Sequence, residues 1–204
     1  MTKIMTPSSK TTTAGQIDKA VGNYRALLEK HSREFDSEAV QSVLGQPELA
    51  NRMLAVFRQL VEMVSNLIVR LVKVNRTRTP QQALDATGRK PYTYRKVVDS
   101  MPKGVGEEAE VVFFNLGRYV TDDELEKEYE LRGLKPADPY SLAAVNEADP
   151  AFADENPNGT HWKDADGKWC FAAFSRWCDG GRGVSVLRHD HGWDVDWWFV
   201  GLRK

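Results

Sequence analysis

Two histidines and two aspartates near the C-terminus have the types and spacing that could hold a metal ion. His189 and His191 alternate in a His-Asp-His run, and Asp194 and Asp196 follow. Alternate residues of a strand point to the same face, so both imidazoles and one carboxylate could meet a single ion. The spacing matches no established metal motif. We assign no metal ligand and no cofactor, and keep a metal-dependent enzyme using His189 and His191 as an alternative.

The two cysteines, Cys170 and Cys178, are the other candidates for chemistry, because a thiol beside a histidine can act as a nucleophile. Nothing else in the sequence marks an activated thiol. Two cysteines are also too few for a disulfide-stapled scaffold, although these two could pair across a hairpin. We therefore expect no catalysis and interpret the chain as a binding protein.

The segment from Cys170 to Lys204 has a pattern typical of a binding surface. All six tryptophans of the chain lie at or after Trp162, and four of them fall in this segment. Between the bulky residues lie side chains that share no chemistry. We expect the bulky residues to form a fixed scaffold and the interleaved residues to bind a ligand. The predicted scaffold residues are Trp177, Trp193, Trp197, Trp198 and Phe199, and the predicted ligand-binding residues are Ser175, Cys178, Gly181, Gly183, Ser185, Leu187, His189, His191, Gly192 and Asp194.

The run 184–189 shows how a strand would separate these two roles. Side chains of a strand alternate between two faces, so one set can pack a core while the other changes without unfolding the domain. Buried aromatic side chains each contribute about 2–3 kcal/mol, which would let the scaffold tolerate such changes. The predicted core set is Val184, Val186 and Arg188, and the predicted surface set is Ser185, Leu187 and His189.

The elements before this segment are predicted to be mostly helical. Residues 1–15 are rich in Ser, Thr and Lys and are expected to be a disordered tail, and residues 16–90 a helical region for assembly or tethering. Apolar residues spaced by three or four predict an amphipathic helix over 47–74, whose near-heptad seam is a possible homo-oligomer interface. The seam consists of Leu49, Met53, Val56, Leu60, Met63, Leu67, Leu71 and Val74.

Residues 109–204 predict an α+β domain that follows a linker at 91–108, in which a short strand is expected at 95–98. A Val- and Phe-rich strand is expected at 109–120. Thr121 and Glu124 form a capping box for a charged helix that ends at Gly133, and Asp138 precedes a second helix. A hairpin at Asp166-Gly167 and several short antiparallel strands complete the domain.

This order of elements and the C-terminal residues resemble the variable proteins of diversity-generating retroelements, which occur in bacteria and phages. In that family, adenine-directed mutagenic reverse transcription diversifies a segment of a C-type lectin fold. The resemblance implies a C-type lectin-like domain over 109–204, with two helices and a variable segment at about 171–201. The closing Phe199-Val200-Gly201-Leu202-Arg203 also resembles the last strand of lectin folds related to formylglycine-generating enzymes.

The residue types of the segment agree with that resemblance. Randomised adenine-rich codons yield Ser, Cys, Gly, Leu, His and Asp but never Trp, Lys, Glu, Gln or Met. The ten interleaved residues contain only the permitted types, and residues 171–201 contain no Lys, Glu, Gln or Met. The segment departs from the family pattern in having no Asn, so no undiversified codon is visible. A fixed, aromatic-rich binding domain remains an alternative.

Charge and hydropathy limit the kinds of partner that are expected for this chain. The formal net charge is −1, but residues 70–103 hold nine Lys or Arg and residues 107–155 hold fourteen Asp or Glu. We expect two solvated faces of opposite sign, with mutual attraction or nucleic-acid binding through residues 70–103 as alternatives. The most apolar run, 53–74, is interrupted by charged residues, and no signal peptide is visible. A cytoplasmic protein whose partner is another protein is expected, without membrane insertion or nucleic acid.

Overall fold

The computed structural model describes residues 12–46, 48–65 and 67–204, and of residues 59 and 62–65 it describes only the backbone. The chain divides into two compact units between Val64 and Ser65. The division lies well before the expected linker at 91–108, so residues 67–108 belong to the C-terminal unit. The expected tail lies mainly on residues 1–11, outside the described residues.

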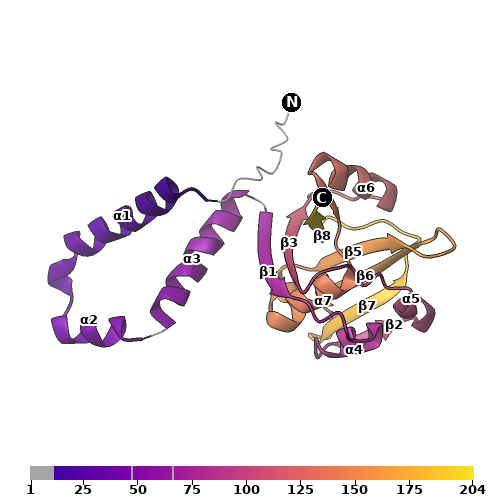
Figure 1. The fold of residues 1–204 in the computed structure, drawn as a ribbon, viewed down its shortest axis with the longest axis horizontal. Helices are drawn as coiled ribbons and strands as arrows, with labels where there is room; N and C mark the ends of the chain where they lie inside the picture. Colours follow the sequence, from indigo (N-terminus) through magenta and orange to yellow (C-terminus); the bar gives the residue numbers. More distant parts are fainter. Residues whose placement is uncertain (1–11, 47, 66) are drawn as a thin grey trace. The chain divides into compact units, whose positions relative to one another are not determined.

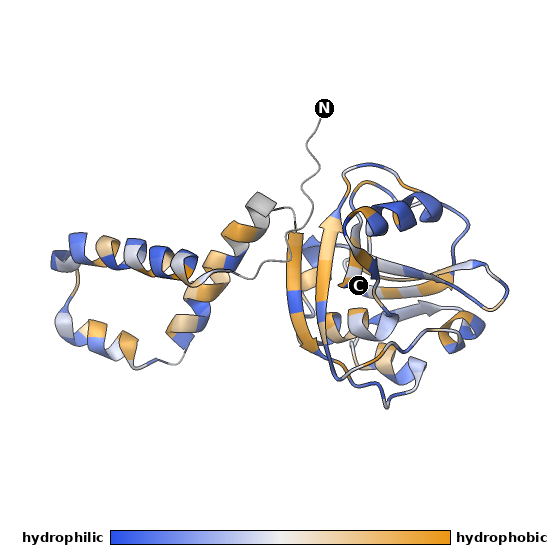
Figure 2. Ribbon diagram, turned by 45° about the horizontal axis from the view of Figure 1, so that its top comes forward, coloured by the Kyte–Doolittle hydropathy of each residue, from blue (hydrophilic) through white to orange (hydrophobic). Residues whose placement is uncertain are grey.

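The N-terminal unit consists of helices α1 (Ala14–Lys30), α2 (Ser37–Leu44) and α3 (Glu48–Ser65), with a short 3-10 turn, η1 (Ser32–Glu34), after α1 (Figure 1). Thr13 begins α1 with a capping box to Gln16, and Asp36 caps α2. No residue of α1 or α2 is buried. Figure 2 shows apolar and polar residues alternating along these helices. Apolar side chains among them, such as Val21 and Leu44, are exposed.

The predicted helix over 47–74 is wrong in its last third. Helix α3 ends at Ser65, and residues Leu67–Lys73 form strand β1. Strand β1 pairs antiparallel with β3 (Glu108–Asn115), and Ile68 lies buried opposite Phe113. The sequence Leu-Ile-Val-Arg-Leu-Val-Lys contains β-branched residues and matches a period of two as well as a helical period, so pairing with a partner strand decides its conformation.

The C-terminal unit is built on one eight-stranded sheet, in the order β1-β3-β8-β5-β6-β7-β2 with β4 paired to β8. Most neighbours are antiparallel, as expected, but β2–β7 and β5–β8 are parallel. The last strand returns to pair with β3. The remaining strands are β2 (Lys90–Thr93), β4 (Leu134–Pro136), β5 (Asn158–Lys163), β6 (Trp169–Arg176), β7 (Arg182–Arg188) and β8 (Trp198–Arg203).

Five helices accompany the sheet in this unit, and three of them lie within 109–204, where two were expected. The two predicted ones are confirmed, with Thr121 and Glu124 forming the capping box of α6 and Asp138 capping α7. The expected strand at 95–98 is wrong, because these residues form a helix, α5. The helices are α4 (Pro80–Asp85), α5 (Arg95–Asp99), α6 (Asp122–Leu131), α7 (Pro139–Ala148) and α8 (Phe152–Glu155). The unit mixes helices with one sheet, which is compatible with the predicted α+β class.

Two apolar cores hold the unit together. The larger core joins Val184 and Val186 of β7 to apolar side chains of α4, α5, α7 and α8. The smaller one joins Trp193 and Phe199 to Leu125 and Tyr129 of α6. Figure 1 accordingly shows α6 at the top of the unit and α4 and α5 at its foot. None of the helices in the described part of the chain is long and apolar enough to cross a lipid bilayer.

Candidate ligand-binding face

Half of the predicted ligand-binding residues share one face of the β6–β7 pair. Gly183 lies opposite Ser175, Ser185 opposite Ala173, and Leu187 opposite Phe171. His189 continues the ladder, because its backbone N–H donates to the Trp169 carbonyl at 2.9 Å. Neighbours paired across strands point to the same side of a sheet, so these residues form one row.

The opposite face of β7 is the core face, as the alternation predicts. Val184 and Val186 are buried in the larger core, whereas Ser185 and Leu187 are only half-buried. Arg188 is the exception in the predicted core set, since its side chain is exposed and lies 2.5 Å from Asp164. Changes at Ser185 and Leu187 therefore do not enter the larger core, although their β6 neighbours Ala173 and Phe171 pack in and against the smaller one.

Strand β2 extends this face with two tyrosines that the sequence did not assign to it. Tyr92 pairs with Ser185 in the parallel β2–β7 ladder, and Tyr94 follows by donating its N–H to the Val186 carbonyl at 2.9 Å. Tyr92 is 63% exposed and Tyr94 48%. Tyrosine is enriched at protein interfaces. The alternation Lys-Pro-Tyr-Thr-Tyr was the available signal, but Pro91 and the surrounding charges favoured a loop.

Trp177 closes one end of the row by lying over Gly183. A Cβ atom added to Gly183 would lie 1.9 Å from Cε2 of Trp177, and Gly183 is buried. The Lys90 ammonium lies 5.5 Å from the centroid of the Trp177 ring. Gly183 therefore serves the packing of Trp177. It is not an interchangeable surface residue, contrary to its predicted role.

Trp193 closes the other end and is the centre of an aromatic cluster. Its ring meets those of Trp197, Phe199 and Phe171 edge-on at centroid distances of 5.4, 5.7 and 5.6 Å. It also covers Gly159, where an added Cβ atom would lie 2.6 Å from the indole. Trp193 and Phe199 are buried, and Trp177, Trp197 and Trp198 are half-buried. The five tryptophan and phenylalanine residues predicted as scaffold thus all pack to some degree.

A buried carboxylate fixes the position of this cluster. Asp122, at the start of α6, lies 2.6 Å from Nδ1 of His189 and 2.6 Å from Nδ1 of His161, and accepts the indole N–H of Trp193 at 2.9 Å. Burial acts to raise the pKa of Asp122, but these three hydrogen bonds outweigh it and hold the pKa well below its ordinary value. Asp122 is therefore ionised and accepts from all three rings.

This network changes the interpretation of the His-Asp-His run. His189 turns to Asp122 and is a structural residue at the edge of the face, whereas His191 is exposed and lies 3.3 Å from Asp190. The described residues contain no group of three or more His, Cys, Asp or Glu that could hold a metal ion. The sequence did not single out Asp122 and His161, which lie far from His189 along the chain.

The other predicted residues lie at opposite ends of β7. Cys178 and Gly181 are in the turn before it, and His191, Gly192 and Asp194 are in the loop after it. Seven residues of strand separate these groups by roughly 20 Å. Cys178, His191 and Asp194 are exposed. The predicted residues thus form a row with a loop at each end, which suits a broad contact better than a small-molecule pocket.

The two cysteines are free thiols, Cys170 buried and Cys178 exposed. Burial raises the pKa of Cys170, which disfavours the thiolate that a nucleophile requires.

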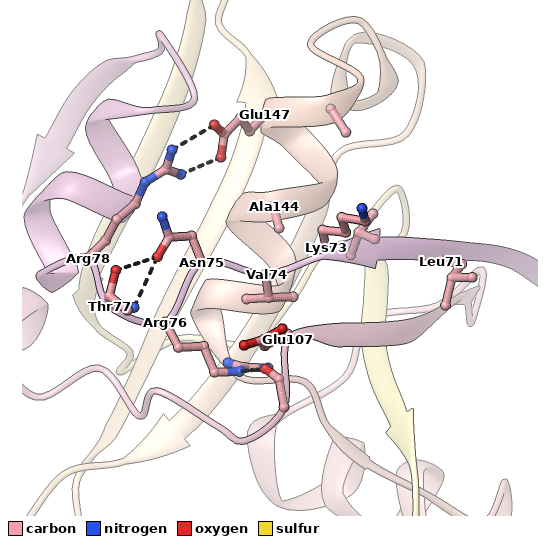
Figure 3. Close-up of a pocket in the computed structure, with 13 residues that line it drawn as sticks. Leu71, Lys73, Val74, Asn75, Arg76, Thr77, Arg78, Glu107, Ala144 and Glu147 are labelled. Atoms are coloured by element: carbon pink, nitrogen blue, oxygen red, sulfur yellow. Dashed lines mark hydrogen bonds and ion pairs between the residues drawn. The ribbon is translucent and has the colours of Figure 1, made fainter.

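Several of the basic residues at 70–103 form ion pairs and hydrogen bonds with other residues of the same unit. Arg76 forms an ion pair with Asp138 at 2.7 Å, and Arg78 donates two hydrogen bonds, of 2.5 and 3.0 Å, to the carboxylate of Glu147. Figure 3 shows this second pair in an open groove of about 890 Å³ along β1 and α7. Arg89 is buried and donates to Asn146 and to the carbonyls of Ser175 and Pro150. These three guanidinium groups thus bind the unit's own acidic and carbonyl groups, where solvated faces of opposite sign were expected.

Comparison with known proteins found no match to any family model, curated protein or solved structure. None of the ten predicted ligand-binding residues lines the groove of Figure 3. The geometry of the face therefore carries the functional argument.

Proposed function

We propose that the C-terminal unit is a ligand-binding domain of C-type lectin type, whose β6–β7 face recognises another protein. The observation that carries the proposal is the row formed by Ser175, Ser185 and Leu187 on one face of a strand pair whose other face lies in the larger core. A row of this kind presents side chains to a ligand while the core beneath it is unchanged.

The order of elements supports the lectin-type assignment. Strand β3, helices α6 and α7, and strands β5, β6, β7 and β8 follow one another as the resemblance implies, with only short β4 and α8 between them. Strand β8 returns beside β3. The exposed Tyr92 and Tyr94 enlarge the face with residues that favour protein partners. Recognition without catalysis is the function we assign.

We further propose that the face is diversified, as in the variable proteins of diversity-generating retroelements. The support is compositional: the interleaved residues are of the types that randomised adenine-rich codons yield. Sequencing the source locus tests this. A near-copy of the last part of the gene, differing where the copy has adenine and lying beside a reverse-transcriptase gene, is expected. A locus without such a copy would leave a fixed binding domain.

The N-terminal helices are proposed to assemble copies of this chain. Apolar side chains on one side of α3 are exposed, including Met53, Val56 and Leu60, and α1 exposes Val21 and Leu28 in the same way. The polar sides are balanced within each helix by pairs such as Arg25–Glu29 and Arg52–Glu48. No strong charge therefore opposes association of like with like, and burying these stripes favours a helical bundle of several copies.

A binding assay combined with a thermal melt distinguishes loss of the binding face from loss of the folded structure. We expect the double variant Ser185→Arg and Leu187→Glu to lose a ligand selected on the wild-type protein while keeping its melting temperature. The matched control is the exposed pair Arg203→Glu and Lys204→Glu at the end of β8, which should keep binding. Equal loss in both variants would place the ligand elsewhere.

A further inference from the structure

A second groove, of about 670 Å³, lies between α6, β5 and the loop before β3. Its walls include Trp162, Trp169 and Leu202, and Lys135 and Lys163 supply positive charge. None of the ten predicted ligand-binding residues lines it. Its volume falls within the range of about 300–1,000 Å³ that is usual for small-molecule sites, and aromatic walls with a few polar groups are typical of them.

The groove is lined in part by a buried imidazole, one of whose nitrogens makes no well-formed hydrogen bond. His161 is 1% exposed, and its Nδ1 atom is held by Asp122. Its Nε2 atom makes no hydrogen bond of acceptable geometry, although Oε1 of Glu126 lies 3.0 Å away. Leaving a buried donor unsatisfied costs about 1–3 kcal/mol, so a group that met Nε2 correctly would be bound favourably.

The charge of this ring defines what it can bind. Burial acts to lower the pKa of His161, but the hydrogen bond to Asp122 and the negative charges of Asp122 and Glu126 outweigh it and raise the pKa. The Trp169 ring stacks on the imidazole at 4.5 Å and 11°, and the ammonium of Lys163 lies 4.4 Å from the Trp169 centroid. Aromatic faces favour cations. At pH values below this raised pKa, Nε2 carries a proton and can donate to an anion.

Glu126 already places a carboxylate near that donor. Its side chain is 42% exposed, so it can turn toward water and leave the position beside Nε2 open. The other acidic groups of the groove compete little with an entering anion. Asp138 is paired with Arg76 at 2.7 Å, and Asp123 is exposed to solvent.

We propose that this groove binds a small organic carboxylate with a flat apolar body. Its carboxylate takes the place of Glu126 at Nε2 of His161, and its body lies against Trp169. The site is separate from the ligand-binding face, although Asp122 contacts both His161 and His189. A carboxylate bound here and a protein bound on the face would thus share one structural anchor.

Benzoate is the probe that tests this site, with benzamide as its uncharged counterpart. In full-length protein labelled with ¹⁵N-histidine at about pH 6, the imidazolium is the expected form. Benzoate should then shift the Nε2 resonance of His161 saturably, and benzamide should not. Glu126→Ala removes the competing carboxylate and should tighten benzoate binding by about tenfold, equivalent to about 1.4 kcal/mol.

The control is Glu130→Ala, which removes an exposed carboxylate from the same helix. It should leave the benzoate affinity unchanged. Three results would overturn the proposal: no saturable shift in the wild-type protein up to roughly 50 mM benzoate, equal shifts with benzamide, or similar shifts in all four histidines of the chain. Binding that is seen only in Glu126→Ala would likewise show an engineered cavity and not a native site.

Discussion

Oδ2 of Asp122 lies 2.6 Å from Nδ1 of His189, so a single carboxylate ties the first turn of α6 to the loop that follows β7. Its other oxygen accepts from His161 on β5 and from Trp193. Three separate parts of the C-terminal unit therefore meet at Asp122, and the position of the proposed ligand-binding face depends on it.

Replacing Asp122 with Asn should destabilise the unit strongly. The amide keeps the shape but loses the charge and one acceptor oxygen, leaving buried rings without a partner, so we expect a loss of about 3 kcal/mol in the free energy of unfolding. Urea denaturation followed by tryptophan fluorescence measures it, because all six tryptophans lie in this unit. Asp123→Asn, at the exposed neighbouring position, should change stability by less than about 0.5 kcal/mol. Equal losses would contradict a special role for Asp122.

His161 should make stability depend on pH. Because its pKa is raised in the folded protein, its stabilising contribution is complete below the ordinary value of 6.5 and is lost as the pH rises through the folded-state pKa. The difference in unfolding free energy between wild type and His161→Gln should therefore be larger at about pH 5.5 than at about pH 9. Denaturant titrations at the two pH values measure it. His191→Gln, at an exposed site, provides the control, and a gap that does not vary with pH would refute the charged state.

A methyl group at residue 183 should lower the free energy of unfolding. Gly183→Ala places its Cβ against the Trp177 ring, and we expect a loss of about 1–3 kcal/mol together with a change in tryptophan fluorescence. Gly181→Ala, in the adjacent turn, meets only the Asp179 carboxylate at 3.0 Å and should cost less than about 0.5 kcal/mol. Thermal melts of the pair compare them directly. If Gly183→Ala melts like wild type, Trp177 moves freely and the constraint does not hold.

The aromatic cluster predicts a ranking of substitutions. Trp193→Ala removes a buried ring and the partner of Asp122, so it should cost about 3–5 kcal/mol. Trp197→Ala should cost less, because that ring is half-buried. His191→Ala should be nearly neutral. Melting temperatures that put His191→Ala below Trp193→Ala would show that the scaffold has been assigned to the wrong residues.

The helical unit should control the number of copies in an assembly. Val56→Glu combined with Leu60→Glu places charges in the exposed stripe of α3, and we expect it to reduce the mass measured by sedimentation to that of one chain. Arg58→Glu is the matched control on the polar side of the same helix and should leave the mass unchanged. A wild-type protein that sediments as a single chain at high concentration would refute the proposed assembly.

Local signals predicted the elements that depend on nearby residues. Thr121, Asp138 and the Asp166-Gly167 turn act within a few residues of their own position, and each lies where the sequence placed it. The alternation of Val184 and Val186 with Ser185 likewise predicted which side of β7 is core. Such features need no knowledge of distant parts of the chain.

Features that depend on long-range pairing could not be predicted in this way. Residues 67–73 fit a helix or a strand equally well until β3 pairs with them. Strand β2 forms because β7 lies beside it, although Pro91 argues against a strand. The link between Asp122 and His189 joins residues that only the folded sheet brings together. Strand pairing and burial therefore decide the conformation of residues whose local sequence pattern fits more than one structure.

If the segment is diversified, the contact between Gly183 and Trp177 limits which new codons can yield a folded protein. Random codons at 183 would mostly encode side chains that displace the indole, and random codons at 189 would mostly remove a partner of Asp122. Many daughter genes would then yield poorly folded protein. Surviving copies should be uniform at these two codons and divergent at 185, 187, 191 and 194, so the usable repertoire is smaller than the number of mutable codons suggests.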